Sequence, residues 1–432
     1  MKYLKVILLI LLFFQYINIS YAASINIFGG NEDLININIT KITGDKFSSK
    51  NIAYKINKNI KKQLNSTKIF SVQSDKINLL DKFTDSNNNN FHYADIAINV
   101  NKKANNNYKA NIKLYDKIQQ KEIFNENYLL DSKNEAKKIA AIISDKIYKY
   151  FTGINGYQNT KIIYVSEHGS ALNRKRKLAI KNIYDDKIEY LNIKNELILS
   201  PRFNHDGKKI IYLSYKKHKP QLFIYDLEKK QEKLLFKEKN LNFAPRFSKD
   251  GSMLTYSSSF EGNTEIMLYN FQTKKKTKLT NHPAIDTSPD FSPDNKTIIF
   301  SSDRDGSQKL YLIDIESKKL RKINSGYGNY STPRWSPDGK YISYTKTHRG
   351  KSHIGIINMK NLEMKNLTKS YKDDTPNWAP NSKFIIFTRM NPKKSNHKSN
   401  YSNLYITNLN GDLISKITTD NDASDADWII NN

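Results

Sequence analysis

Short apolar runs separated by polar turns fill most of the chain after residue 160. Each run holds mainly β-branched and aromatic residues, as in Ile210-Ile211-Tyr212-Leu213 and Tyr341-Ile342-Ser343-Tyr344. An Asp-Gly pair or a close variant precedes most of these runs, as at Asp338-Gly339. Because glycine adopts positive φ without a steric penalty, Asp-Gly between such runs indicates a tight hairpin. A second apolar run and a third, more polar run follow each time, so the pattern predicts units of short antiparallel strands.

One phrase introduces each unit and returns at a nearly fixed interval. A clear copy is Thr332-Pro333-Arg334-Trp335-Ser336-Pro337-Asp338-Gly339. The corresponding prolines stand at 201, 245, 289, 333 and 376, so they are 44, 44, 44 and 43 residues apart. A period of this length with four short strands per unit is typical of a β-propeller. Proline lacks the N–H that a strand donates to its neighbour, so we expect it at the first position of a strand.

Counting the strands predicts how the ring closes. Five complete units run from about residue 200 to residue 418. Three further strands, 162–165, 178–183 and 188–193, precede them without a Pro-x-Phe strand, and the last copy of the phrase, at 425–428, has no strands after it. We therefore predict an all-β six-bladed β-propeller over 160–432, in which the C-terminal strand completes the first blade and removes the open edges.

The chain before the repeats reads differently. Residues 1–22 hold two lysines around an apolar stretch and end in Ser-Tyr-Ala, which is typical of a secretory signal peptide cleaved after about Ala22. Residues 23–154 mix alternating runs such as 34–39 with two helical patterns, so we predict a small α/β N-terminal domain. Ser48 or Ser49 is expected to cap the first helix, and Gly153 to end the second.

Composition changes this picture little. The 432 residues contain no cysteine, which excludes disulfides, thiolate metal sites and cysteine nucleophiles. The net charge is +28, but the lysines are spread along a chain that is also rich in asparagine and isoleucine. We interpret the charge as a compositional bias and expect no nucleic-acid partner, since no recognition motif is present. Weak attraction to anionic lipid head groups stays open as an alternative.

The order of these features closely resembles the TolB family of the Tol–Pal system. The resemblance rests on the signal peptide, the small α/β domain, the helix ending Phe151-Thr152-Gly153-Ile154 and the six repeats of the proline phrase. It implies a non-catalytic periplasmic scaffold without a cofactor. Such a scaffold links TolA to the peptidoglycan-associated lipoprotein Pal, supports outer-membrane integrity and cell division, and reaches membranes only through its partners.

The resemblance also implies where the partners bind. In the family, Pal sits over the mouth of the propeller and contacts residues just before the blade prolines. The matching positions here are Ala244, Thr287, Ser288, Ser331, Thr332, Asp374 and Thr375. A histidine that the family can show nearby is Leu241 here. Strand crowding near the ring axis would also explain small residues before the prolines. The segment that would bind TolA by strand pairing is the mature N-terminus, Ser24, Ile25, Asn26, Ile27 and Phe28.

An enzyme is the alternative. A propeller-based secreted hydrolase would need a Gly-x-Ser-x-Gly motif, which does not occur in the chain. A polysaccharide lyase would need histidines and carboxylates that converge, and the only combination that the sequence suggests is His205, His282 and Asp286. The Asp-Gly aspartates are read as turn formers rather than metal ligands. The insertion Asn391–Asn403 is expected to be a loop, and its purpose is open.

Overall fold

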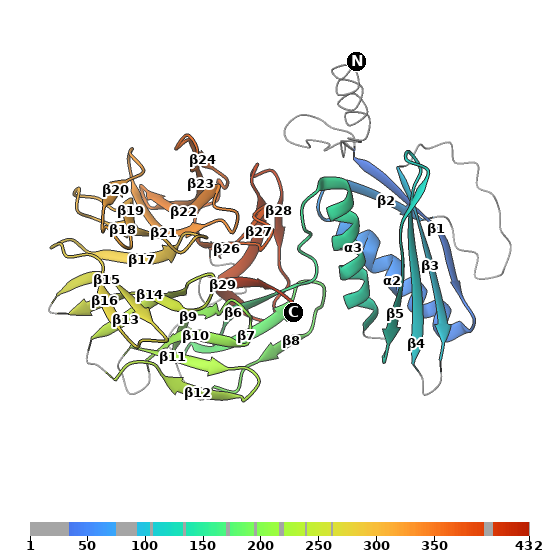
Figure 1. Cartoon of the computed structure of the whole chain (residues 1–432), viewed down its shortest axis with the longest axis horizontal. Helices are drawn as coiled ribbons and strands as arrows, with labels where there is room; N and C mark the ends of the chain where they lie inside the picture. The colour runs from blue at the N-terminus through green and yellow to red at the C-terminus, as the bar shows by residue number, and fades with distance from the viewer. Residues whose placement is uncertain are drawn as a thin grey trace, which may run out of the picture.

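The structure is a computed structural model (Figure 1). It describes residues 34–74, 93–103, 107–132, 135–169, 173–193, 197–215, 220–237, 240–260, 262–392 and 401–431. The predicted signal peptide and the segment Ser24–Phe28 lie outside these residues. Neither helix of the described chain is long and apolar enough to cross a membrane.

The N-terminal domain is built on one five-stranded sheet with the order β2-β1-β3-β4-β5. The strands are β1 (Ile35–Gly44), β2 (Phe70–Ser74), β3 (Ala94–Lys102), β4 (Tyr108–Asp116) and β5 (Lys121–Leu130). β1 pairs in parallel with β2 and β3, and the other pairs are antiparallel. Ile35, Ile37 and Ile39 are buried and alternate with partly exposed residues, so a period of two gives this sheet one apolar face.

Two helices cover that sheet on the side that faces the propeller (Figure 1). They are α2 (Phe47–Asn65) and α3 (Ala136–Thr152). Gly153 ends α3 at φ 70°, as predicted. The predicted serine cap of α2 is wrong. The helix already begins at Phe47, its N-cap Lys46 makes no capping bond, and the Ser49 hydroxyl donates to Asp45 Oδ1 at 2.7 Å instead.

The rest of the described chain forms a propeller of six four-stranded antiparallel sheets, as predicted. The second blade contains β9 (Ile198–Phe203), β10 (Lys209–Ser214), β11 (Gln221–Asp226) and β12 (Gln231–Leu234), and the third contains β13 (Leu241–Phe247), β14 (Met253–Phe260), β15 (Asn263–Asn270) and β16 (Lys276–Lys278). The fourth contains β17 (Asp286–Phe291), β18 (Thr297–Ser302), β19 (Lys309–Asp314) and β20 (Leu320–Lys322), and the fifth contains β21 (Asn329–Trp335), β22 (Tyr341–His348), β23 (Lys351–Asn358) and β24 (Met364–Asn366). The sixth contains β25 (Asp373–Trp378), β26 (Phe384–Asn391), β27 (Tyr401–Asn408) and β28 (Ile414–Lys416). Buried apolar clusters lie between neighbouring blades, so each blade depends on the next one for its core.

The first blade closes the ring with strands from both ends of the propeller sequence. β29 (Asp422–Ile430) pairs with β6 (Thr160–His168), followed by β7 (Lys175–Asn182) and β8 (Ile188–Tyr190). Trp428 lies opposite Ile162, and its indole N–H donates to Thr160 Oγ1 at 2.7 Å. The predicted completion of the first blade by the C-terminal strand is therefore confirmed.

The blade prolines lie inside the first strand of each blade, not at its first position as predicted. The residue before each proline, or before Ala426 in β29, has positive φ, and the strand pairing shifts register there. These residues are Ser200 (φ 51°), Ala244 (49°), Ser288 (57°), Thr332 (48°), Thr375 (52°) and Asp425 (51°). Such a bulge removes the need for a ladder N–H at the proline and re-aims the neighbouring side chains.

The linker contacts the propeller at the turn between the first and second strands of the sixth blade, and α3 contacts it at the turn between β7 and β8, where Lys137 Nζ donates to Asp185 Oδ1 at 3.0 Å. Asn381, in the turn between β25 and β26, donates from Nδ2 to the carbonyl oxygen of Asn155 at 3.0 Å. The Tyr157 ring lies 4.3 Å from the Phe384 ring, centroid to centroid. The linker fits tightly, because a Cβ added to Gly156 would lie 2.0 Å from Asp145 Oδ1. The opposite end of the first strands therefore points away from the N-terminal domain.

Candidate protein-binding mouth of the propeller

The seven residues predicted to bind Pal lie together at the end of the propeller that points away from the N-terminal domain. They stand one or two positions before a proline in β13, β17, β21 and β25, and all are half-buried. These strands contact one another in that order around the axis. We call this set the mouth arc: Ala244, Thr287, Ser288, Ser331, Thr332, Asp374 and Thr375.

Hydroxyl groups from the second strands hold the mouth arc in place. Ser257 Oγ, on β14, lies 3.4 Å from Thr287 Oγ1 and accepts the backbone N–H of Ser288 at 3.2 Å, both in the next blade. Thr345 Oγ1, on β22, lies 2.8 Å from Thr332 Oγ1 and donates to Asp374 Oδ1 at 2.9 Å. Three of these four bonds cross from one blade to the next, so small polar residues here have a role beyond fitting a crowded axis.

The same arrangement continues to the closing strand. Thr388 Oγ1, on β26, lies 2.8 Å from Thr375 Oγ1 and accepts the backbone N–H of Asp425 at 3.0 Å. Ala244 has no hydroxyl, and Leu213 occupies the position on β10 that corresponds to Ser257. The mouth arc therefore has an apolar start at Ala244 and a polar end at Thr375.

A second set of side chains, which the sequence analysis missed, lies near the axis, directly after the prolines or after Ala426 in β29. We call it the axial ring: Arg202, Arg246, Asp290, Arg334, Asn377 and Asp427. Five of these six side chains are at most 9% exposed: Arg202, Arg246, Arg334, Asn377 and Asp427. The signal was present in the repeats, because this one position carries a charged or amide side chain in every copy of the phrase.

Ion pairs and backbone contacts connect members of the axial ring to one another and to neighbouring blades, although the Nε atoms of Arg202, Arg246 and Arg334 have no hydrogen-bond partner among the described residues. Arg246 Nη1 lies 3.1 Å from Asp427 Oδ1, and the Asn377 amide donates to the same oxygen. Asp427 Oδ2 accepts the backbone N–H of Phe203 at 2.7 Å, and Asp290 Oδ2 accepts that of Trp335 at 2.9 Å. Each of these two aspartates therefore ties its own blade to the next one.

Burial sets the electrostatics of these groups. It raises the pKa of Asp290, although Arg246 and Arg334 oppose the rise. It lowers the pKa of Arg334 to about 10, against the attraction of Asp290. Burial also disfavours the charged form of Asp425. Its Oδ1 lies 2.5 Å from Arg202 Nη2, however, and this guanidinium group helps to hold the pKa of the carboxyl below its usual range. Arginines and aspartates near the axis thus compensate one another.

The arrangement that a lyase would need does not form. Asp286 is fully buried and accepts two bonds from Arg304, at 2.8 and 3.0 Å. His282 Nδ1 accepts the backbone N–H of Ala284, and His205 is exposed in the turn that follows β9. Within the described ranges, no group of three or more histidine, aspartate or glutamate side chains is placed to hold a metal ion.

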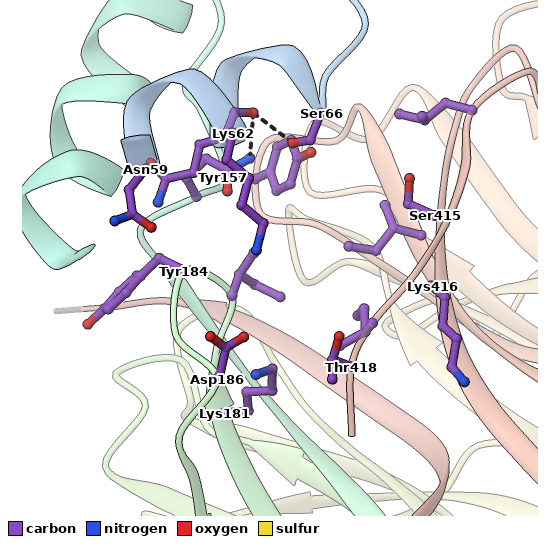
Figure 2. Close-up of a pocket in the computed structure, with 16 residues that line it drawn as sticks. Asn59, Lys62, Ser66, Tyr157, Lys181, Tyr184, Asp186, Ser415, Lys416 and Thr418 are labelled. Atoms are coloured by element: carbon purple, nitrogen blue, oxygen red, sulfur yellow. Dashed lines mark hydrogen bonds between the residues drawn. The ribbon is translucent and has the colours of Figure 1, made fainter. Parts of the chain in front are cut away.

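A pocket of about 240 Å³ lies between the two domains (Figure 2). No residue of the mouth arc lines it. Lys62 of α2 and Ser66, just after this helix, line one side, and Ser415 and Lys416 of β28 line the other. The carbonyl oxygen of Gln63 accepts a bond from Ser66 Oγ at 2.7 Å and one from Gln158 Nε2 at 3.4 Å. These contacts join α2 to the linker, so the pocket belongs to the domain interface.

Comparison with known proteins assigns the family. A family model described as "TolB beta propeller domain" matches residues 148–429. The chain belongs to the TolB β-propeller family. The match begins in α3 and includes all six blades, so the closing strand β29 is part of what the family shares.

Individual TolB proteins resemble shorter stretches. The chain is 41% identical over 92 residues to "Tol-Pal system protein TolB" of Pelagibacter ubique, which is 21% of each chain. It is 34% identical over 112 residues to the protein of the same name from Paramagnetospirillum magneticum, which is 25% of each chain. These alignments therefore span about a fifth to a quarter of the relatives' length.

A solved TolB structure shares the fold over both domains. The crystal structure of TolB from Acinetobacter baumannii superposes with a TM-score of 0.78 and covers 92% of this chain and 97% of its own. The two sequences are 22% identical. The likeness confirms the fold class, an α/β domain followed by a six-bladed propeller.

Proposed function

We propose that this chain is a non-catalytic periplasmic scaffold of the Tol–Pal system that links TolA to the lipoprotein Pal. In this role it would maintain outer-membrane integrity and support envelope constriction during cell division. The observation that carries the proposal is membership of the TolB family across all six blades. Relatives named as Tol–Pal system proteins support it. The compensated axial ring also supports a binding role, because its charged groups are engaged in holding blades together.

Pal is proposed to bind over the mouth arc. Its residues come from four consecutive blades, are half-buried and carry small side chains, so a partner can approach the backbone closely. The hydroxyl bonds between blades keep this surface rigid, which limits the entropy lost on binding. Pal would thus contact a preformed surface on the side opposite the N-terminal domain.

TolA is proposed to bind the mature N-terminus, Ser24–Phe28, after removal of a signal peptide at about Ala22. The support comes from the sequence, in which Ile25, Ile27 and their neighbours alternate as an added strand requires. Such a strand would contribute its main chain to an exposed edge of TolA. The export that this proposal needs is consistent with a chain that has no cysteine.

Isothermal titration tests both partners. The protein from residue 23 to residue 432 is titrated with the soluble domain of Pal and with the C-terminal domain of TolA from the same organism. A second protein lacks residues 24–30. We expect the parent to bind both partners and the shortened protein to bind only Pal, because a terminal strand adds little to either core. Failure of the parent to bind either partner would contradict the proposed function, and full TolA binding by the shortened protein would contradict only the assignment of the N-terminus.

A further inference from the structure

A second cavity, of about 280 Å³, opens at the mouth between the sixth and first blades. Asp374 and Thr375 of the mouth arc line it, together with Thr388 from β26 and Ser424 and Asp425 from the closing strand. Its volume is many times the roughly 30 Å³ that a water molecule occupies in the liquid. The cavity can therefore hold a side chain of a protein that covers the mouth.

Most charged groups in its wall already have partners. Glu167 on β6 lies 3.3 Å from Arg174 Nε and 3.2 Å from Arg176 Nε. Asp425 is paired with Arg202 at 2.5 Å. These pairs leave little net attraction for an ion beside Glu167 and Asp425, because each of these two carboxylates is compensated by a guanidinium group.

Asp374 differs from the other carboxylates of the wall. Its Oδ1 accepts bonds from Thr345 Oγ1 at 2.9 Å and from the backbone N–H of Thr375 at 2.6 Å. In the described part of the chain no lysine, arginine or histidine nitrogen forms an ion pair with it. Burial raises the pKa of Asp374, and the hydrogen bonds from Thr375 and Thr345 only partly offset this rise. A carboxylate in such a place is stabilised by a cation brought to it.

We infer that the cavity receives a basic side chain of Pal, a lysine or an arginine, and that Asp374 is the residue that binds it. The inference rests on the proposed function, since Pal is the partner assigned to the mouth. The nearby Lys372 is exposed, so an acidic side chain at the rim would gain little from it. A basic side chain would lose its hydration on entering the cavity. It would form hydrogen bonds to Asp374 and to the hydroxyl of Thr375 or Ser424 in place of those to water.

Titration of Pal against single variants tests the inference. Asp374→Asn keeps an oxygen that can accept the bonds of Thr345 and Thr375 but removes the negative charge. We expect it to weaken Pal binding about 10- to 100-fold, as for the loss of one hydrogen bond to a charged group. Asp412→Asn is the matched control, because Asp412 is exposed in the turn between β27 and β28, at the other end of these strands. The control is expected to bind Pal like the parent.

Replacement of Pal residues tests the same contact without altering this chain. Each lysine and arginine on the Pal surface is changed to methionine, one at a time. The partner of Asp374 is the residue whose replacement weakens binding to the parent about 10-fold or more but adds nothing in the Asp374→Asn background. Its identification would support the inference even if Asp374→Asn lowered the yield of folded protein.

Three results would overturn the inference. Pal binding by Asp374→Asn within about 2-fold of the parent would do so while leaving the proposed function intact. Loss of binding in Lys372→Gln but not in Asp374→Asn would show that the cavity favours an acidic side chain. Failure of the parent protein to bind Pal would remove both the inference and the proposed Pal site.

Discussion

The mouth arc and the axial ring occupy the same inner strands, on either side of the same prolines, yet their side chains are used differently. Axial-ring residues such as Asp427 are buried, paired with arginine and bonded to the backbone of a neighbouring blade. Mouth-arc residues are half-buried and interact mainly through hydroxyl groups, and Asp374 has no ion pair among the described residues. The difference indicates that residues only about two positions apart on the same strand have separate roles. Axial-ring residues hold the blades together, and mouth-arc residues are available to bind a partner.

The bulge before each proline accounts for this separation. A strand without a bulge would place residues two positions apart on the same face. Here the residue just before the proline, such as Thr375 at φ 52°, adopts a left-handed conformation, and the register of the ladder changes. The side chain before the bulge can then point to the mouth while the side chain after the proline points to the axis.

Removing the closing strand should have the largest effect on the ring. Deletion of residues 424–432 takes Asp427 and Trp428 away and leaves β6 with an open edge next to the sixth blade. We expect loss of cooperative unfolding and aggregation on heating. Deletion of Asn431 and Asn432 alone is the control. An unchanged calorimetric transition in the longer deletion would show that the ring does not depend on closure by β29.

Asp427→Ala should cost stability rather than only affinity. It leaves Arg246 buried without its ion-pair partner and frees the backbone N–H of Phe203. Breaking a buried pair in this way typically costs about 3–5 kcal/mol of unfolding free energy. Urea denaturation measures this loss, with the exposed Asp131→Ala as a control expected to change stability by less than about 0.5 kcal/mol. If both variants unfolded at the same urea concentration, the axial ring would not be a structural element.

Much of this fold could be predicted from the sequence because it repeats. The prolines at a spacing of 44 residues and the unpaired last copy of the phrase were sufficient to predict six blades and closure by the C-terminal strand. Gly153 marked the end of α3 because only glycine adopts positive φ there at no cost. The cap of α2 was not predictable in the same way, since Ser49 bonds to Asp45 instead of to the helix backbone.

The chemistry of the inner strands was harder to predict than their order. Because proline has no N–H to donate to a neighbouring strand, we predicted it at the start of a strand. The structure instead has the proline inside the strand, next to a bulge where no such N–H is needed. The axial ring depends on contacts such as that between Arg246 and Asp427, which are 181 residues apart. A linear pattern shows that a position is charged but does not show which charges meet at the axis.

Ala244→Asp tests whether the mouth arc can be changed without harm to the ring. Aspartate is compatible with the backbone there, since Asp425 occupies the corresponding position at φ 51°. A carboxylate buried against Pal without a cation should cost about 2–5 kcal/mol, roughly a 30-fold to several-thousand-fold loss of affinity. Melting temperatures should stay close to those of the parent.

Ala244→Ser is the matched control for that variant. Serine occupies the equivalent positions 200 and 288 at φ 51° and 57°, so Ala244→Ser should fold and bind Pal nearly as the parent does. Normal Pal binding by Ala244→Asp, together with loss of binding in the outer-edge variant Lys275→Asp, would place Pal elsewhere on the propeller. Unfolding of Ala244→Asp would instead show that the two layers of side chains are not separable at this blade.

Thr287→Ala should have the smallest effect and so sharpens the distinction within the mouth arc itself. The Thr287 hydroxyl lies 3.4 Å from Ser257 Oγ, a long contact whose loss should barely affect stability. If the hydroxyl also bonds to Pal, its removal should cost about 1 kcal/mol, or roughly a 5-fold loss of affinity, because the bond is between neutral groups. Thr287→Ser keeps the hydroxyl and should restore the affinity, which separates the hydrogen bond from the methyl contact. Titration of Pal against the two variants decides between them: equal weakening by both would assign the contribution of Thr287 to its methyl group. The apolar part of the mouth arc would then extend from Ala244 to Thr287.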